Sequence, residues 1–116
     1  MNAISSNWVT VCSEDDLVCG SGVCALIETG GKPQQVALFR ETAAGPVYAL
    51  DNHDPIGNAN VLSRGIIGSQ GDKLVVASPL YKQHFDLQTG ECLEDKTVKV
   101  PAWKTRIHEG QVQLKI

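Results

Sequence analysis

The chain has 116 residues and a net charge of −3, which suits one domain, spanning residues 1–116, with a modest core. Its 10 lysines and arginines are scattered, which argues against nucleic acid or an anionic membrane surface as a partner. The N-terminal "MNAISSNW" lacks the basic and apolar segments of an export signal, and no apolar run approaches the roughly 20 residues of a membrane span. A cytoplasmic protein is therefore expected.

The predicted elements are strands, because apolar residues alternate or occur in short runs and no long helical period is present. The first strand covers residues 7–13, and Ser13 is placed to cap a short helical turn in "SEDDL". Strands follow at 22–28, 34–40 and 46–50, separated by glycine-containing turns. Later strands are predicted within 64–79, on both sides of a turn at Thr89-Gly90, and as a pair within 97–116.

Two irregular segments interrupt this pattern, and we call them the first loop (residues 51–60) and the second loop (residues 78–84). Many short strands with turn signals between them predict an all-β fold, an antiparallel sandwich or barrel with a small hairpin-loop subdomain. Because one strand hairpin separates the two loops, they are expected side by side at one end of a sheet. Loops on a rigid scaffold are where function usually lies.

The two loops resemble those of a Rieske domain, through "YALDNHDPIG" in the first and "ASPLYKQHFDLQTGEC" in the second. In that family Cys-x-His and Cys-Pro-x-His motifs hold a [2Fe–2S] cluster. The ligand positions here carry Asp54, Ile56, Ser78 and Tyr81, and neither loop contains a cysteine. The resemblance therefore implies a Rieske-like fold in which residues 51–92 form a degenerate cluster-binding subdomain without its cluster.

A narrower resemblance covers essentially the whole chain, through "WVTVC", "GVCAL", "VLSRGII" and "ASPLYKQHFDLQTGECLED". These segments are similar to those of the small subunit of assimilatory NAD(P)H-dependent nitrite reductase. The resemblance implies that a large partner subunit carries FAD, siroheme and an iron–sulfur cluster and reduces nitrite to ammonium. It also implies that this chain binds no cofactor, supplies no catalytic residue, and acts by binding that large subunit.

The vacated cluster site has two alternative uses. Asp54 could accept backbone N–H bonds from its own loop, as aspartates in turns do. If the apolar side chains of the loops are exposed, they form a docking patch for the large subunit; if they are buried, they only repair the core. The partner-binding candidates are Pro55, Ile56, Arg64, Pro79, Leu80, Tyr81 and Lys82.

Two other functions remain as alternatives. One is a free-standing Rieske-type ferredoxin that carries electrons, against which the missing ligands argue directly. The other is a small metal-dependent enzyme in which His53, Asp54 and His84 form a two-histidine, one-carboxylate set. The simpler interpretation of the histidines is that they are surface residues of the loops. Trp8 and Trp103 are expected in the core rather than at an interface.

Overall fold

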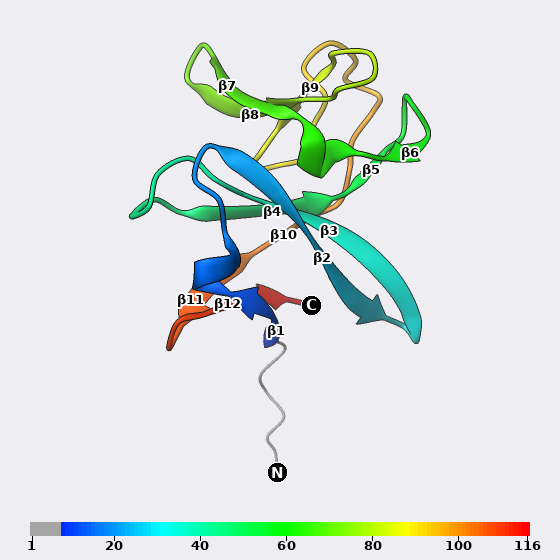
Figure 1. Ribbon diagram of the computed structural model, residues 1–116. Helices are drawn as coiled ribbons and strands as arrows, with labels where there is room; N and C mark the ends of the chain where they lie inside the picture. Colours follow the sequence, from blue (N-terminus) through cyan, green and yellow to red (C-terminus); the bar gives the residue numbers. More distant parts are fainter. Residues whose placement is uncertain (1–7) are drawn as a thin grey trace.

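The computed structural model describes residues 8–116, and in it three layers of antiparallel strands are stacked (Figure 1). One outer layer has the strand order β1 (Trp8–Ser13), β12 (Gln111–Lys115), β11 (Thr105–His108). The central layer has the order β10 (Ala102–Trp103), β4 (Val47–Asp51), β3 (Lys32–Arg40), β2 (Ser21–Thr29). The other outer layer has the order β7 (Ile66–Gln70), β8 (Lys73–Ala77), β9 (His84–Asp86).

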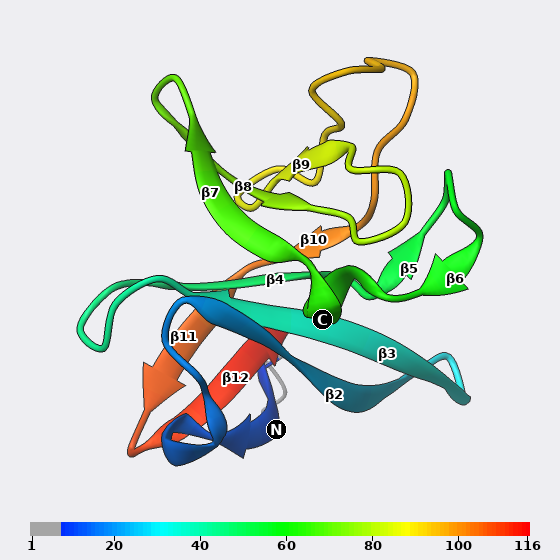
Figure 2. The same ribbon diagram turned by 45° about the horizontal axis from the view of Figure 1, so that its top comes forward.

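Two short strands and two 3₁₀ turns complete the described chain. The strands β5 (His53–Asp54) and β6 (Ala59–Asn60) pair as a hairpin inside the first loop. Two 3₁₀ turns, η2 (Glu14–Asp16) and η3 (Leu62–Arg64), connect strands. Ser13 caps η2 as the sequence predicts, since its hydroxyl accepts the Asp15 N–H and the Asp16 carboxylate accepts the Ser13 N–H. Figure 2 shows the β5–β6 hairpin next to the loop between β8 and β9.

The strand β3 of the central layer is buried on both faces from Val36 onward, and its apolar run "VALF" sends successive side chains to opposite sides. Val36 and Leu38 pack toward β12, in a cluster that includes Leu114. Ala37 and Phe39 pack toward β8 and β9, in a second cluster. One continuous run of apolar residues therefore supplies two cores.

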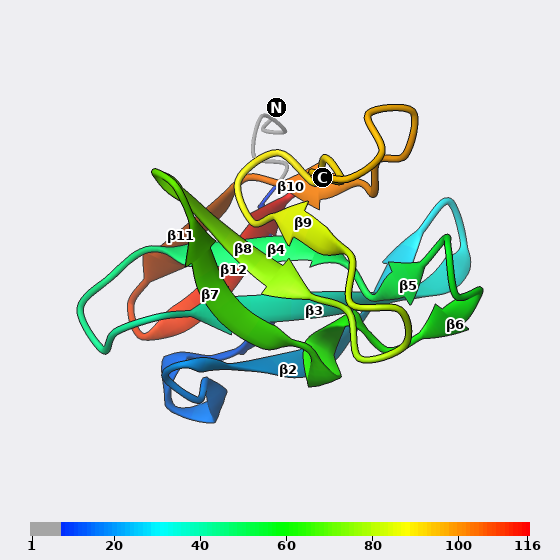
Figure 3. The same ribbon diagram turned by 90° about the horizontal axis from the view of Figure 1, so that it is seen from above.

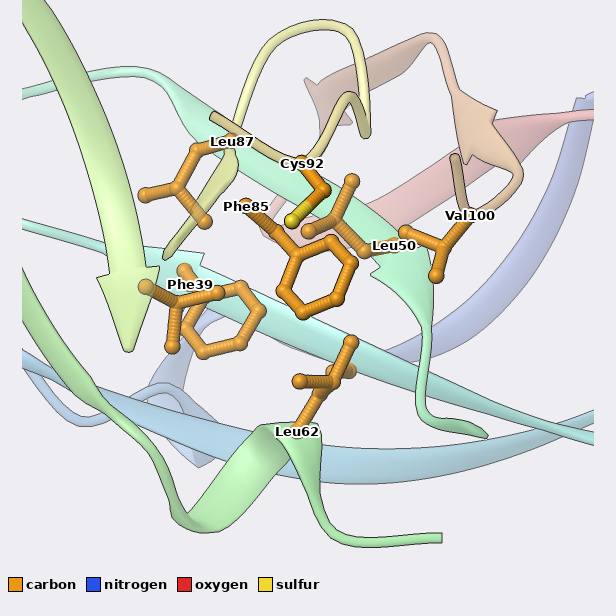
Figure 4. Packing of buried hydrophobic residues seen from close by; sticks show 9 residues of the cluster. Phe39, Leu50, Leu62, Phe85, Leu87, Cys92 and Val100 are labelled. Carbon is orange, nitrogen blue, oxygen red and sulfur yellow. The ribbon is translucent and has the colours of Figure 1, made fainter. Parts of the chain in front are cut away.

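The second cluster is the platform under the two loops, and Figure 4 shows its side chains converging from strands and loops that are far apart in the sequence. Phe39 and Phe85 are fully buried, and Leu62 of η3 closes one end of the cluster. Full burial of such a side chain is worth about 1.5–3 kcal/mol. The loops therefore begin and end on strands that are held by a substantial core.

The predicted all-β architecture with a hairpin-loop subdomain is confirmed, with differences in detail. The first loop holds the β5–β6 hairpin, and the strand predicted after Thr89-Gly90 is reduced to isolated bridges. The chain turns there because the Asp86 carboxylate accepts the N–H groups of residues 88 and 89, and Gly90 adopts φ +82. The first predicted strand begins at Asn7, which lies outside the described residues.

Candidate functional site

The first loop turns tightly around the carboxylate of Asp54, which lies at the end of β5. One oxygen, Oδ1, accepts the N–H of Ile56 at 2.8 Å and that of Gly57 at 3.1 Å. The Asp54 carbonyl accepts the N–H of Asn58 at 2.7 Å, and Asn58 takes a positive φ of 56. The side chain of Asp54 thus organises its own loop, as the sequence predicts for an aspartate in a turn.

The other oxygen of the same carboxylate joins the two loops. Ser78 Oγ donates to Asp54 Oδ2 at 2.5 Å, and both residues are 0% exposed. The second loop is closed on Ser78 as well, because its N–H donates to the Gln83 carbonyl and its carbonyl accepts the Lys82 N–H. The resemblance assigns Asp54 and Ser78 to the two thiolate positions of a Rieske domain, and the structure brings these two residues into direct contact.

A second contact between the loops is apolar. A Cβ added to Gly57 would lie 2.3 Å from Leu80 Cδ1 and 3.3 Å from Leu80 Cβ, so Leu80 rests directly against the backbone of the first loop. Ile56, next to it, is half-buried and packs against the cluster beneath. The loops are therefore held together by one buried hydrogen bond and by apolar packing on a glycine.

The apolar side chains of the two loops differ in their exposure. Ile56 faces the core, whereas Leu80 is 43% exposed and Tyr81 is 65% exposed. Lys82 is exposed and adopts φ +66, an uncommon conformation for a residue other than glycine. The remaining candidates lie around them: Pro55 and Arg64 are exposed, and Pro79 is half-buried.

Sequence reasoning missed one exposed apolar residue beside these loops. Ile66 is 73% exposed and pairs with Ala77, the last residue of β8 before the second loop. The signal was present in "GIIG": neighbouring strand residues point to opposite faces, so only one of two adjacent isoleucines can face the core. Ile67 takes that place. We call the exposed apolar surface formed by Ile66, Leu80 and Tyr81 the tip.

The first loop is anchored to the central layer through Asn52, which is 2% exposed. Its Oδ1 accepts the Ser63 N–H at 2.7 Å, and its Nδ2 donates to Gln35 Oε1 at 2.8 Å. One amide therefore ties the loop to β3 and to η3. This gives a structural reason for the asparagine in the "DN" that leads into the loop.

The alternative metal set of His53, Asp54 and His84 does not converge. His53 Nδ1 lies 3.0 Å from Asn60 Oδ1 within the β5–β6 hairpin, while His84 Nδ1 lies 2.5 Å from Glu94 Oε2. Asp54 is turned toward Ser78. Within residues 8–116, no three histidine, cysteine or acidic side chains are grouped so that they could hold a metal ion.

The contact between the His84 ring and the Glu94 carboxylate changes the pKa of Glu94. Partial burial raises the pKa of Glu94, but hydrogen bonds from the backbone and ring of His84, together with its charge, outweigh this and lower the pKa below its usual value. The Glu94 carboxylate also accepts the His84 N–H at 2.7 Å. This pair fixes the start of β9 to the following loop.

The donor set does not fit a [2Fe–2S] cluster. Such a cluster requires thiolate sulfurs, joined in the Rieske case by two imidazoles. The positions that the resemblance assigns to the ligands offer one carboxylate, one hydroxyl, one phenol and an isoleucine side chain, which has no donor atom. The carboxylate and the hydroxyl are already bonded to each other.

Comparison with known proteins finds relatives that cover nearly the whole chain. The family model of the Rieske-like [2Fe-2S] domain matches residues 7–115. The nitrite reductase (NADH) small subunit of Salmonella typhimurium is 46% identical over 110 residues, covering 95% of this chain and 98% of that protein. The solution structure of the nitrite reductase [NAD(P)H] small subunit from Erwinia carotovora is 50% identical, with a TM-score of 0.81, and covers 96% of this chain and 82% of the other.

Two further matches show how far the similarity to known proteins extends. A ferredoxin of carbazole 1,9a-dioxygenase from Nocardioides aromaticivorans has a TM-score of 0.71 and covers 94% of this chain and 97% of that chain. Because the two sequences are only 22% identical, this match shows the fold alone. The nitrite reductase [NAD(P)H] large subunit of Klebsiella oxytoca is 38% identical over 108 residues, covering 93% of this chain but only 11% of that protein. A region similar to this chain is thus part of a large-subunit polypeptide.

The fold and the family match define a Rieske-like domain. Within that class, the chain belongs to the family of nitrite reductase small subunits. The comparisons support this family rather than the ferredoxin alternative, which shares only the fold. Among the described residues, no helix has the length and apolar character needed to cross a membrane.

Proposed function

We propose that this chain is the non-catalytic small subunit of a cytoplasmic NAD(P)H-dependent nitrite reductase and acts by binding the large subunit. The large subunit would carry FAD, siroheme and an iron–sulfur cluster and would reduce nitrite to ammonium. The observation that carries the proposal is the bond between Asp54 and Ser78. It occupies the two thiolate positions, so the domain retains the Rieske-like framework but lacks the donors for its redox centre.

The match to the Klebsiella oxytoca large subunit supports the partnership. There, a region similar to 93% of this chain lies in one polypeptide with the rest of the large subunit, and therefore in the same assembly. Covalent linkage raises the effective concentration of two modules that bind each other. A separate small subunit has to obtain the same association from its surface.

The tip is the surface that we assign to this association. Ile66, Leu80 and Tyr81 are apolar and between 43% and 73% exposed, and Leu80 is held in place through Gly57. Rigid aromatic and aliphatic anchors with a polar rim are typical of interface centres. Lys82, Arg64 and Pro55 are exposed and would form that rim, while Pro79 stiffens the second loop and Ile56 supports the first from below.

Co-purification tests the proposal. The large subunit of the same organism, carrying an affinity tag, should retain the untagged chain, and nitrite-dependent NAD(P)H oxidation should rise when the chain is added. Tyr81→Asp should weaken retention by about tenfold or more, because an exposed aromatic anchor that the partner would cover is replaced by a charge that must be desolvated.

Val18→Asp is the matched control. Val18 is apolar and 52% exposed but lies outside the tip, so the same chemical change there should leave retention unaltered. Both variants should unfold at the same urea concentration as the parent, since both positions are exposed. Failure of the large subunit to retain the parent chain would reject the proposed function, and equal retention of the Tyr81→Asp variant would reject the tip.

A further inference from the structure

A second surface lies on the opposite side of β9 from the tip. The second loop enters β9 at His84, and the strand leaves at Asp86 into Leu87, Gln88 and Thr89, which line an open groove of about 860 Å³. Figure 3 shows a loop at each end of β9. The groove is also lined by Trp8, Tyr48 and Trp103 and by the segment Lys99–Thr105 around β10.

The aromatic lining departs from the sequence prediction. Trp103 packs against a core cluster, as predicted, but it is only half-buried and its remaining surface faces the groove. Trp8 is also half-buried there, with the Arg106 guanidinium 4.4 Å from its ring centroid. Both tryptophans of the chain and one of its two tyrosines, Tyr48, therefore meet at one groove. Aromatic rings with one wet edge are typical of binding surfaces.

The charges of the groove have one sign. Lys99 and Lys104 line it, and no aspartate or glutamate does, although the chain carries a net charge of −3. Within residues 8–116 neither lysine side chain has an ion-pair partner. Asp72 and Asp86 line a neighbouring hollow that shares Tyr48, Gln88 and Thr89 with the groove, and Lys73 lies 3.5 Å from Asp86 there.

Two aromatic side chains of the groove carry polar hydrogens that can be donated to a ligand. In the described part of the chain, the Tyr48 hydroxyl and the Trp103 indole N–H have no hydrogen-bond partner. The groove also runs along β10, which is an edge strand because the order of its layer is β10-β4-β3-β2. An edge strand offers backbone groups to an added extended segment.

From these observations we infer that the groove binds an extended, acidic segment of the large subunit. Carboxylates of that segment meet the two lysine ammonium groups, its apolar side chains lie on the aromatic rings, and its backbone runs beside β10. The volume of about 860 Å³ lies within the range of about 300–1,000 Å³ that is typical of sites for drug-sized ligands, so the segment in contact with the groove is only a few residues long. This inference rests on the proposed function and adds a second contact, separated from the tip by the length of β9.

Charge reversal in the groove tests the inference. The double variant Lys99→Glu/Lys104→Glu should bind the large subunit about tenfold or more weakly at low salt, because two attractions become repulsions. The double variant Lys32→Glu/Lys96→Glu makes the same change in net charge at two exposed lysines outside the groove, and should bind within about twofold of the parent. Salt should weaken binding of the parent more than binding of the groove variant.

Tryptophan emission supplies an independent measurement. Because both tryptophans line the groove, tryptophan-free peptides that cover the acidic segments of the large subunit should shift the emission of the parent chain. The same peptides should leave the emission of the Lys99→Glu/Lys104→Glu variant unchanged.

The outcomes separate the two proposals. If the parent binds the large subunit and the groove variant binds equally well, the groove inference is wrong and the proposed function stands. If the groove variant and the control pair weaken binding equally, net charge rather than the groove is responsible, and the inference is again wrong. If the parent chain does not bind the large subunit, both are wrong.

Discussion

Removal of the Ser78 hydroxyl is the sharpest test of how the loops are held together. Ser78→Ala leaves Asp54 Oδ2 without a hydrogen-bond partner among residues 8–116, in a place where both residues are 0% exposed. A hydrogen bond to a charged group contributes about 1.5–3 kcal/mol, and a buried acceptor left unpaired loses this in full. We expect a loss of about 2 kcal/mol in the free energy of unfolding and a fall in Tm of roughly 8 °C.

A double-mutant cycle shows whether this loss belongs to the bond between the loops. Asp54→Ala alone also removes the acceptor of the Ile56 and Gly57 N–H groups and should cost about 3 kcal/mol. In the double variant no carboxylate remains to be orphaned, so its cost should fall short of the sum by about 1.5 kcal/mol.

Urea unfolding followed by far-UV circular dichroism measures each free energy. Ser69→Ala is the control, because Ser69 is an exposed residue of β7, and its change should stay within about 0.5 kcal/mol. Additivity of the two single variants to within about 0.5 kcal/mol would refute a coupled bond between the loops. The cluster-free loops would then depend on apolar packing alone.

Two further predictions concern the neighbouring loop. Gly90→Ala should destabilise the domain by about 3 kcal/mol or more, because Gly90 has φ +82 and the new Cβ would lie 2.1 Å from the Val100 carbonyl oxygen. Gly71→Ala is the control and should cost only about 1 kcal/mol, because Gly71 has φ +64 but open space around it. Similar losses of stability in the two variants would contradict this prediction. The lowered pKa of Glu94 contributes stability that is present above the usual pKa of 4.5 and is lost as pH falls through the lowered pKa, and Glu94→Gln should remove this contribution. The urea midpoints of the parent and the variant should therefore differ at neutral pH and converge below the lowered pKa. A difference that stays constant with pH would contradict this prediction.

The strand framework could be predicted because it depends on local patterns. The Gly30-Gly31 turn has φ values of +60 and +81, as the hairpin signal requires, and the Ser13 cap needs only its own turn. The run from Val36 to Phe39 predicts a strand, but only the three layers show why it is apolar throughout. The alternation of side chains along a strand tells which residues share a face of the sheet. It does not tell what covers that face.

The site was predicted in part, for a different reason. The positions of Asp54 and Ser78 follow from their places in the two loop motifs, but their contact joins residues 24 apart in the chain. No local sequence pattern predicts this contact, since serine and aspartate side chains in turns usually form hydrogen bonds with the backbone of their own turn. The groove was missed because Trp8, Tyr48 and Trp103 lie on three separate strands, and only the packing of β1, β4 and β10 brings them together.

The absence of cluster ligands at the positions that the resemblance assigns and the composition of the tip are physically connected. Four metal–ligand bonds would hold the two loops whatever their remaining side chains, and imidazole ligands would occupy the positions of Ile56 and Tyr81. With one hydrogen bond in place of the cluster, the loops need apolar packing, which Leu80 against Gly57 and Ile56 against the core provide. Packing at a protein edge is never complete, so Leu80 and Tyr81 remain partly exposed. The same substitutions that hold the loops without iron thus create an apolar surface that a partner subunit can cover.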